Sequence, residues 1–554
     1  MNPCRIVWDG AAPNHYFGRV VAGIGDVNND GIPDVAIGAP EAPSTTGTIA
    51  GAGRVQIYTG PNGAPLLLFG GLSGQVAGDN FGSAIAGWVD VNGNGVREIV
   101  VGIRKSDAGG TDSGQVKIIE ATGLTVLTLN GAAAFDEFGA AVAVLGDFNG
   151  DGKPEFAVGA PLHDPAAPDS GRVTVYSGAT GAVFLTPAMT PFVVNGSLAA
   201  AQLGFAIAAA GDVNDDGTPD LAVGAPFDSP PGVFLTNHGS VRVISGTDAS
   251  VLWTAYGSAD HYQFGKAVTG IGDTNGDGHD DVLAGGPHPG FGIPGQALVL
   301  SGATGTPLLT VNGTAGSDLF GASVAGLDDV DGDGSPDFAV GAPQVSNQGA
   351  VTVFSGSSGK VLTRSRGESS GAKFGTALAP AGDFDGDGNG DLLVGNPEES
   401  LVACCFQGRA TLLKRLYQPP FASGCAGSGG LVPGIHMEGY GPCVDTPVFG
   451  VGVDNAIGAS LATLVFGAGT LVPPINLDPL FGSAGCNLHV VPDGFIVVST
   501  SGTGPGAGTA SLLGSIPNLP VLAGASIYFQ WYVVDPGPFP IPGALTAGLQ
   551  VTIL

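Results

Sequence analysis

Seven short acidic segments of this 554-residue chain carry the residue types of a metal-binding loop. Each follows the pattern Asp-x-Asn/Asp-x-Asp/Asn-Gly-x-x-Asp/Glu, with a glycine that permits a sharp turn. Calcium takes about six to eight oxygen ligands, and alternate residues of a tight loop can direct oxygens at one centre. In the first loop, Asp26, Asn28 and Asp30 would supply side-chain oxygens. Ile32 would add its backbone carbonyl and Asp34 a closing carboxylate.

The other six loops repeat these five ligand positions in register. Their predicted ligands are Asp90, Asn92, Asn94, Val96 and Glu98; Asp147, Asn149, Asp151, Lys153 and Glu155; Asp212, Asn214, Asp216, Thr218 and Asp220; Asp273, Asn275, Asp277, His279 and Asp281; Asp329, Asp331, Asp333, Ser335 and Asp337; and Asp383, Asp385, Asp387, Asn389 and Asp391. One acidic turn is common, because Asp, Asn and Gly favour turns, but seven copies favour ion binding. We expect up to seven Ca²⁺ ions, with the second site weakest because its loop has fewest carboxylates. Magnesium fits less well, since it tends to keep its waters.

The elements around the loops repeat as well, with a spacing of 54 to 65 residues. A Phe-Gly pair such as Phe17-Gly18 precedes each loop, with Leu203-Gly204 in its place once, and Gly-Ala-Pro or a relative follows most loops. Each repeat reads as four short strands, which predicts a blade of a β-propeller; a solenoid is the alternative. Runs of small residues such as Ala140 to Val144 suit innermost strands, where side chains converge on the axis.

These three-part repeats resemble the FG-GAP repeats of integrin α-subunit propellers, across roughly residues 5–417. The resemblance implies a seven-bladed propeller with calcium in the loop that joins the first two strands of a blade. It also implies that partners bind the opposite face.

The last repeat lacks its fourth strand, because Thr411–Tyr417 runs directly into prolines. Residues 5–8 match the missing strand in sequence and position, so we expect them to complete the seventh blade and close the ring. Cys4 would then lie near Cys404 and Cys405, and a disulfide could lock the closure in an oxidising compartment.

The net charge of −30, with only 18 Lys and Arg residues, argues against a nucleic-acid partner. The most apolar stretch, residues 455–475, is interrupted by polar residues and prolines and favours buried strands over a transmembrane segment. The first residues show no signal peptide. We nevertheless expect an extracellular or cell-surface location.

Three long loops after the Gly-Ala-Pro segments are candidate ligand-binding elements: 41–53, 104–113 and 227–238. His15-Tyr16 and His261-Tyr262 would lie on the same face by the family analogy. The chain has no nucleophile elbow, phosphate-binding loop or zinc motif, so we expect no enzyme. The expected function is adhesion or the binding of a protein or glycan. A carbohydrate-active enzyme (polysaccharide lyase or hydrolase) or a lectin is the alternative.

A second domain follows the repeats. We expect the propeller to span residues 1–417, a linker to span 418–424, and a small β-sandwich to span 425–554, where short alternating runs such as Gly494–Thr500 occur. The last domain loosely resembles a module that ends many secreted bacterial proteins. Its role could be sorting, surface attachment or a second binding activity.

Overall fold

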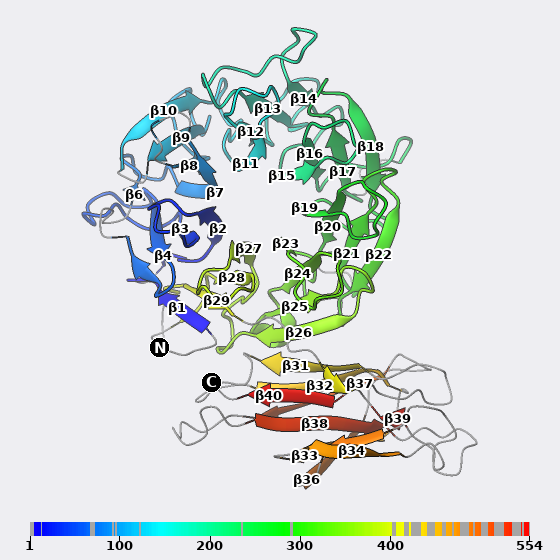
Figure 1. The fold of residues 1–554 in the computed structure, drawn as a ribbon. Helices are drawn as coiled ribbons and strands as arrows, with labels where there is room; N and C mark the ends of the chain where they lie inside the picture. Colours follow the sequence, from blue (N-terminus) through cyan, green and yellow to red (C-terminus); the bar gives the residue numbers. More distant parts are fainter. Residues whose placement is uncertain are drawn as a thin grey trace.

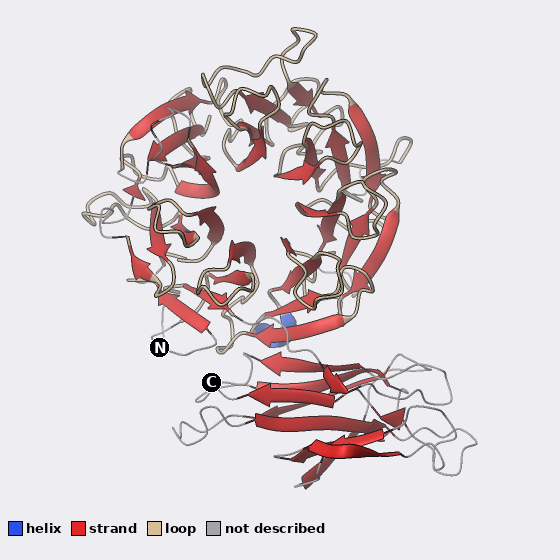
Figure 2. Cartoon of the chain, in the orientation of Figure 1, coloured by secondary structure: helices blue, strands red, loops and turns tan. Residues whose placement is uncertain are grey.

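The computed structural model is a ring of seven β-sheets around a central axis, followed by further strands (Figure 1). It describes residues 5–12, 14–66, 72–90, 94, 97–120, 123–233, 237–288, 292–400 and 406–414, together with the course of eleven strands after residue 419. Nearly all of its regular structure is β-strand (Figure 2). The ring is a seven-bladed β-propeller, as the repeats predicted, rather than a solenoid.

The blades follow the chain, and each runs from an inner to an outer strand. Their strands are β2 Val20–Gly25, β3 Asp34–Ala39, β4 Arg54–Thr59, β5 Ala64–Pro65 and β6 Leu72–Ser73; β7 Phe81–Val89, β8 Glu98–Ile103, β9 Gln115–Glu120 and β10 Thr125–Asn130; β11 Ala141–Gly146, β12 Glu155–Ala160, β13 Arg172–Tyr176 and β14 Val193–Asn195; β15 Ala206–Gly211, β16 Asp220–Ala225, β17 Ser240–Ile244 and β18 Val251–Tyr256; β19 Ala267–Gly272, β20 Asp281–Gly286, β21 Gln296–Leu300 and β22 Pro307–Asn312; β23 Ser323–Leu327, β24 Asp337–Ala342, β25 Ala350–Phe354 and β26 Val361–Arg366; and β27 Ala377–Gly382, β28 Asp391–Asn396, β29 Arg409–Leu413 and β1 Arg5–Asp9. One short 3₁₀ turn, η1 Val345–Asn347, interrupts the sixth blade.

Adjacent blades pack through the repeated apolar residues. The second strand of every blade is buried along its whole length, for example β3 and β16. The phenylalanine of each Phe-Gly pair contacts the preceding blade. Phe81, for example, is buried and forms an isolated parallel β-bridge with Gly53, the residue before β4. Gly53 has φ 85°, and a Cβ at this position would lie 2.2 Å from the Phe81 carbonyl oxygen. The repeated glycines therefore allow the backbones of neighbouring blades to touch.

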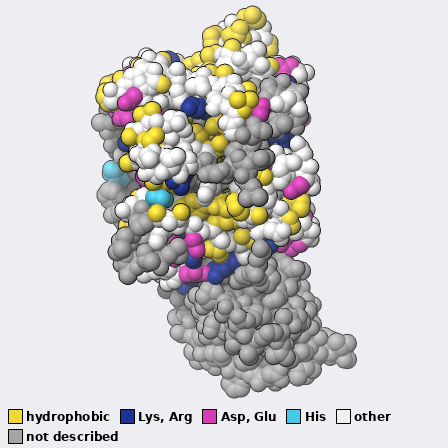
Figure 3. Space-filling model, turned by 90° about the vertical axis from the view of Figure 1, so that its left-hand side faces the viewer, with side chains coloured by type: hydrophobic (Ala, Val, Ile, Leu, Met, Phe, Trp, Pro, Cys, Tyr) yellow, Lys and Arg dark blue, Asp and Glu magenta, His cyan; other side chains and the backbone are white. Residues whose placement is uncertain are grey.

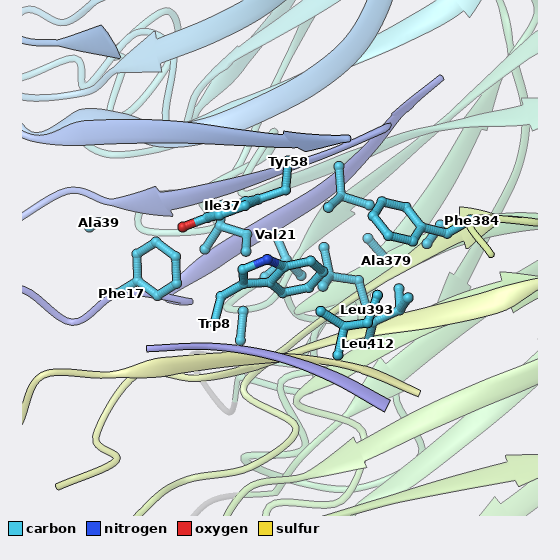
Figure 4. Packing of buried hydrophobic residues seen from close by; sticks show 14 of the residues in the cluster. Trp8, Phe17, Val21, Ile37, Ala39, Tyr58, Ala379, Phe384, Leu393 and Leu412 are labelled. Carbon is cyan, nitrogen blue, oxygen red and sulfur yellow. The ribbon is translucent and has the colours of Figure 1, made fainter. Parts of the chain in front are cut away.

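The N-terminal strand closes the ring. β1 pairs antiparallel with β29, from Arg5 opposite Leu413 to Asp9 opposite Arg409. This is the pairing that the sequence predicted. Trp8 of β1 packs against Tyr58 of the first blade and Phe384 of the seventh, with ring centroids 4.9 and 6.0 Å away (Figure 4). The proposed disulfide of Cys4 lies outside the described residues and stays a prediction.

Strands also fill the C-terminal region. They are β30 Pro420–Ala422, β31 Gly434–Gly439, β32 Phe449–Ala456, β33 Leu461–Gly467, β34 Thr470–Asn476, β35 Asn487–Val490, β36 Gly494–Ser499, β37 Gly508–Gly514, β38 Ser526–Val533, β39 Ala544–Leu545 and β40 Gly548–Thr552. The apolar stretch at 455–475 thus contains strands. In the part of the chain that is described, no helix has the length and apolar character needed to span a membrane. The domain boundaries and the β-sandwich stay predictions.

Candidate metal centres

The acidic loops join the innermost strand of each blade to its second strand. Neighbouring strands are antiparallel, so these loops lie at one end of the blades and the Gly-Ala-Pro loops lie at the other. Adjacent acidic loops also touch: the Lys153 Nζ donates to the Asp90 carbonyl over 2.8 Å, and a ring nitrogen of His279 lies 3.0 Å from the Val213 carbonyl. The acidic loops therefore form a band on one face of the ring.

The first loop is folded around its own carboxylates. Asp26 accepts hydrogen bonds from the backbone N–H groups of Asp30 and Gly31 over 3.0 and 2.8 Å. The Asn28 Oδ1 accepts from Asp30, and the Asp30 Oδ1 accepts from Ile32. These bonds wind the backbone so that alternate side chains face the middle of the loop.

The same hydrogen bonds recur in five other loops. The first ligand accepts from the glycine at the sixth position over 2.7 to 2.9 Å in the loops that begin at Asp147, Asp212, Asp273, Asp329 and Asp383. That glycine has φ between 81° and 92° in all six loops, and no atom lies within 4 Å of an added Cβ. Left-handed backbone geometry, and not crowding, therefore requires glycine here.

The closing carboxylate of each loop is buried at the start of the second strand. In the six loops other than the second, it accepts a backbone N–H from the second residue of the loop, for example Val27 to the Asp34 Oδ2 over 2.9 Å. Burial raises the pKa of Asp34, Asp220 and Asp337 to about 6 and that of Glu155 to about 7. By contrast, hydrogen bonds from the Asn275 side chain and the His279 backbone lower the pKa of the exposed Asp277.

The last two loops gather the most acidic oxygens. One oxygen from each of Asp329, Asp331 and Asp333 lies within 4.8 Å of the others, and the same holds for Asp383, Asp385 and Asp391. Calcium–oxygen bonds are about 2.3–2.6 Å long, so ligand oxygens around one ion stand up to about 5 Å apart. The Asp391 Oδ1 is buried and has no hydrogen-bond partner. The hard oxygen donors and this unpartnered atom fit a calcium ion.

The second loop departs from the pattern. Asn92 and Val96 lie outside the described residues. Asn94 turns its amide to Glu120, with Nδ2 donating to Oε1 over 3.0 Å, and the Lys153 Nζ lies 4.0 Å from the Asp90 Oδ1. Neither Glu120 nor the ammonium group of Lys153 was predicted from the sequence to act at this loop.

The opposite face carries the candidate ligand-binding loops. Loop 41–53 is held by Arg54, which donates to the carbonyl of Pro43 over 2.6 Å. His163 and Asp136 form a pair, with His163 Nδ1 2.8 Å from Asp136 Oδ2. Tyr262 is 2% exposed and packs on His288, so its ring supports the fold. Part of loop 227–238 lies outside the described residues.

Comparison with known proteins agrees with the repeated blades. The FG-GAP repeat family matches residues 17–58, 138–176, 204–244, 320–354 and 374–413, which lie in blades one, three, four, six and seven. Integrin alpha-V of Gallus gallus is 33% identical over 227 residues, covering 39% of this chain and 20% of its own length. Integrin alpha-5 of Xenopus laevis is 34% identical over 207 residues, covering 34% of this chain and 19% of its own.

Five of the seven blades therefore match FG-GAP repeats, and the propeller is integrin α-like. It spans about a fifth of the length of these relatives. A solved structure of BBS1N in complex with ARL6DN covers 73% of this chain and 96% of its own, at 12% identity and a TM-score of 0.41.

Proposed function

We propose that the chain is an extracellular calcium-binding propeller that serves adhesion or binds a protein or glycan ligand, without catalysis. The observation that carries this proposal is the in-register repetition of one carboxylate loop in six described blades. Hydrogen bonds within an isolated acidic turn would not require the same ligand positions in every blade.

The residues listed for the seven loops would hold the ions, and each bound ion would supply positive charge to a loop rich in carboxylates. Seven divalent ions would roughly halve the net charge of −30. If only the carboxylates of the loops are counted, the second site is expected to bind calcium most weakly. Calcium would thus act on the fold, by fixing the ends of the inner two strands of each blade.

The face opposite the ions is the proposed ligand surface. Its loops differ in length and sequence between blades, whereas the acidic loops are nearly identical. Around the rim of the ring seen in Figure 3, the described acidic and basic side chains are scattered among apolar ones. The net charge of −30, with only 18 Lys and Arg residues, makes a protein or glycan a better ligand than nucleic acid.

A binding screen tests the proposal. The full chain is exposed to immobilised glycans and extracellular matrix proteins, once in about 2 mM CaCl₂ and once in excess EGTA. The calcium concentration lies above the Kd of roughly 10⁻⁴–10⁻³ M that is typical of extracellular calcium modules. We expect binding that requires calcium and leaves the ligand intact. Release of sugar fragments would support the enzyme alternative instead, and binding that is unchanged in EGTA would contradict the role of calcium.

A further inference from the structure

One position outside the acidic loops faces the closing carboxylate of each blade. It is the residue that follows the apolar end of the third strand, directly across from the closing acid, as Glu120 lies across from Glu98. Five blades have a hydroxyl residue there: Thr59, Ser177, Ser245, Ser301 and Ser355. The second blade has Glu120 and the seventh has Lys414.

The two exceptions fall on the loop with the fewest carboxylates and on one of the two loops with the most. The second loop offers Asp90 and Glu98, whereas the seventh offers four aspartates. A glutamate at the facing position brings the second blade to three carboxylates. A lysine at the facing position of the seventh blade offsets one of its four aspartates. The net ligand charge there equals that of a loop with three carboxylates, as in most other blades.

Contacts in the structure connect both residues to predicted ligands. Glu120 is 7% exposed and accepts from Asn94 over 3.0 Å. The Lys414 Nζ lies 3.1 Å from the Asp385 Oδ2, and the side chain of Lys414 is 10% exposed. The ammonium group thus contacts one member of the cluster formed by Asp383, Asp385 and Asp391, in which the buried Asp391 Oδ1 has no hydrogen-bond partner.

The sixth blade shows what this position does without a charge. Ser355 donates to the Asp333 Oδ2 over 3.3 Å, and the next residue, Gly356, donates its N–H to the closing Asp337 over 3.0 Å. In this blade an uncharged residue at the position therefore contacts the ion loop.

We propose that this facing position sets the charge, and so the calcium affinity, of each blade. Glu120 supplies a third carboxylate to the second site, and Lys414 competes with calcium for Asp385 in the seventh. The inference rests on the proposed calcium function. It revises the order of affinity derived from the loops alone: the second site is stronger than its two loop carboxylates suggest, although the Lys153 ammonium group near Asp90 offsets part of the added charge, and the seventh is weaker than the sixth.

Crystals of the full chain grown at graded CaCl₂ concentrations test this, because anomalous scattering measures calcium in each loop separately. Glu120→Gln should weaken the second site by about tenfold, and Lys414→Met should strengthen the seventh by about tenfold, since ligand charge tunes affinity. Glu137→Gln and Lys373→Met are matched controls. Both residues precede a Phe-Gly pair at the opposite end of the blades and should leave every loop unchanged.

Melting in EGTA gives a second measurement. Lys414→Met should destabilise the calcium-free protein, because Asp385 loses its ion pair, and should destabilise the calcium-saturated protein less. An unchanged second site in Glu120→Gln, or an unchanged seventh site in Lys414→Met, would overturn the proposal for that blade. Absence of calcium from every loop of the unmodified protein would instead refute the proposed function.

Discussion

Removal of calcium should lower the stability of the propeller strongly. An ion that binds only the folded state adds about 1.4 kcal/mol per site at a concentration about ten times its Kd. Seven independent sites would approach about 10 kcal/mol, which is comparable with the net stability of a whole domain.

The structure indicates where this energy arises. The closing carboxylates are buried, and burial raises their pKa, so a calcium-free loop must hold them either protonated or as unfavourable buried anions. Positive charge at the centre of each loop removes this cost. The stabilisation should therefore depend on the number of intact loops.

Calorimetry of the full chain in about 2 mM CaCl₂ and in excess EGTA measures the effect. This calcium concentration lies above the Kd of roughly 10⁻⁴–10⁻³ M that is typical of extracellular calcium modules. We expect the melting temperature to fall by about 10 °C or more on chelation. Asp277→Asn should reduce the calcium-dependent shift by about one site, whereas Asp136→Asn, on the other face, should leave it unchanged. Identical melting curves with and without calcium would refute the reasoning.

Three further predictions concern pH and closure. Burial first, then neighbouring acids, raise the pKa of Asp391 to about 8. In EGTA this contributes stability that is complete below its unfolded pKa of about 4 and lost as pH rises through about 8. Melting temperatures in EGTA should therefore fall from pH 5 to 8.5; a rise would contradict this. Trp8→Ala should cost about 3–5 kcal/mol in urea unfolding, because Trp8 joins the first and last blades; a loss below about 1 kcal/mol would contradict its role. Deletion of residues 1–9 should expose the edge of β29 and cause aggregation measurable by light scattering; a monomeric product would argue against closure by β1.

Much of the propeller could be predicted from the sequence, because the same turn, loop and strand patterns occur seven times. The Phe-Gly pairs, the acidic loops and the missing last strand each point to blades, and the match of residues 5–8 to that strand predicted the β1–β29 pair. The repeat by itself left a solenoid as the alternative, and the resemblance to FG-GAP repeats implied the seven-bladed ring.

The partners of the loops could not be predicted in the same way. Glu120 lies 26 residues from Asn94, and Lys414 lies 29 residues from Asp385, so their proximity depends on the register of the second and third strands. An alignment of the seven blades at the end of the third strand would have identified these two residues. There, a glutamate and a lysine occupy a position that is a serine or threonine in the other five blades. The backbone role assigned to Lys153 stays a prediction, and the contact of its side chain with the neighbouring loop was not predicted.

The most direct test of the calcium assignment is the metal content of the purified full chain. The purified chain is dialysed against buffer with 2 mM CaCl₂, above the Kd of roughly 10⁻⁴–10⁻³ M that is typical of extracellular calcium modules. Elemental analysis, with the free-calcium background subtracted, should then give about seven calcium ions per chain. The count should drop close to zero after dialysis against EGTA and should not be restored by magnesium alone. Fewer than about one calcium ion per chain would contradict the account.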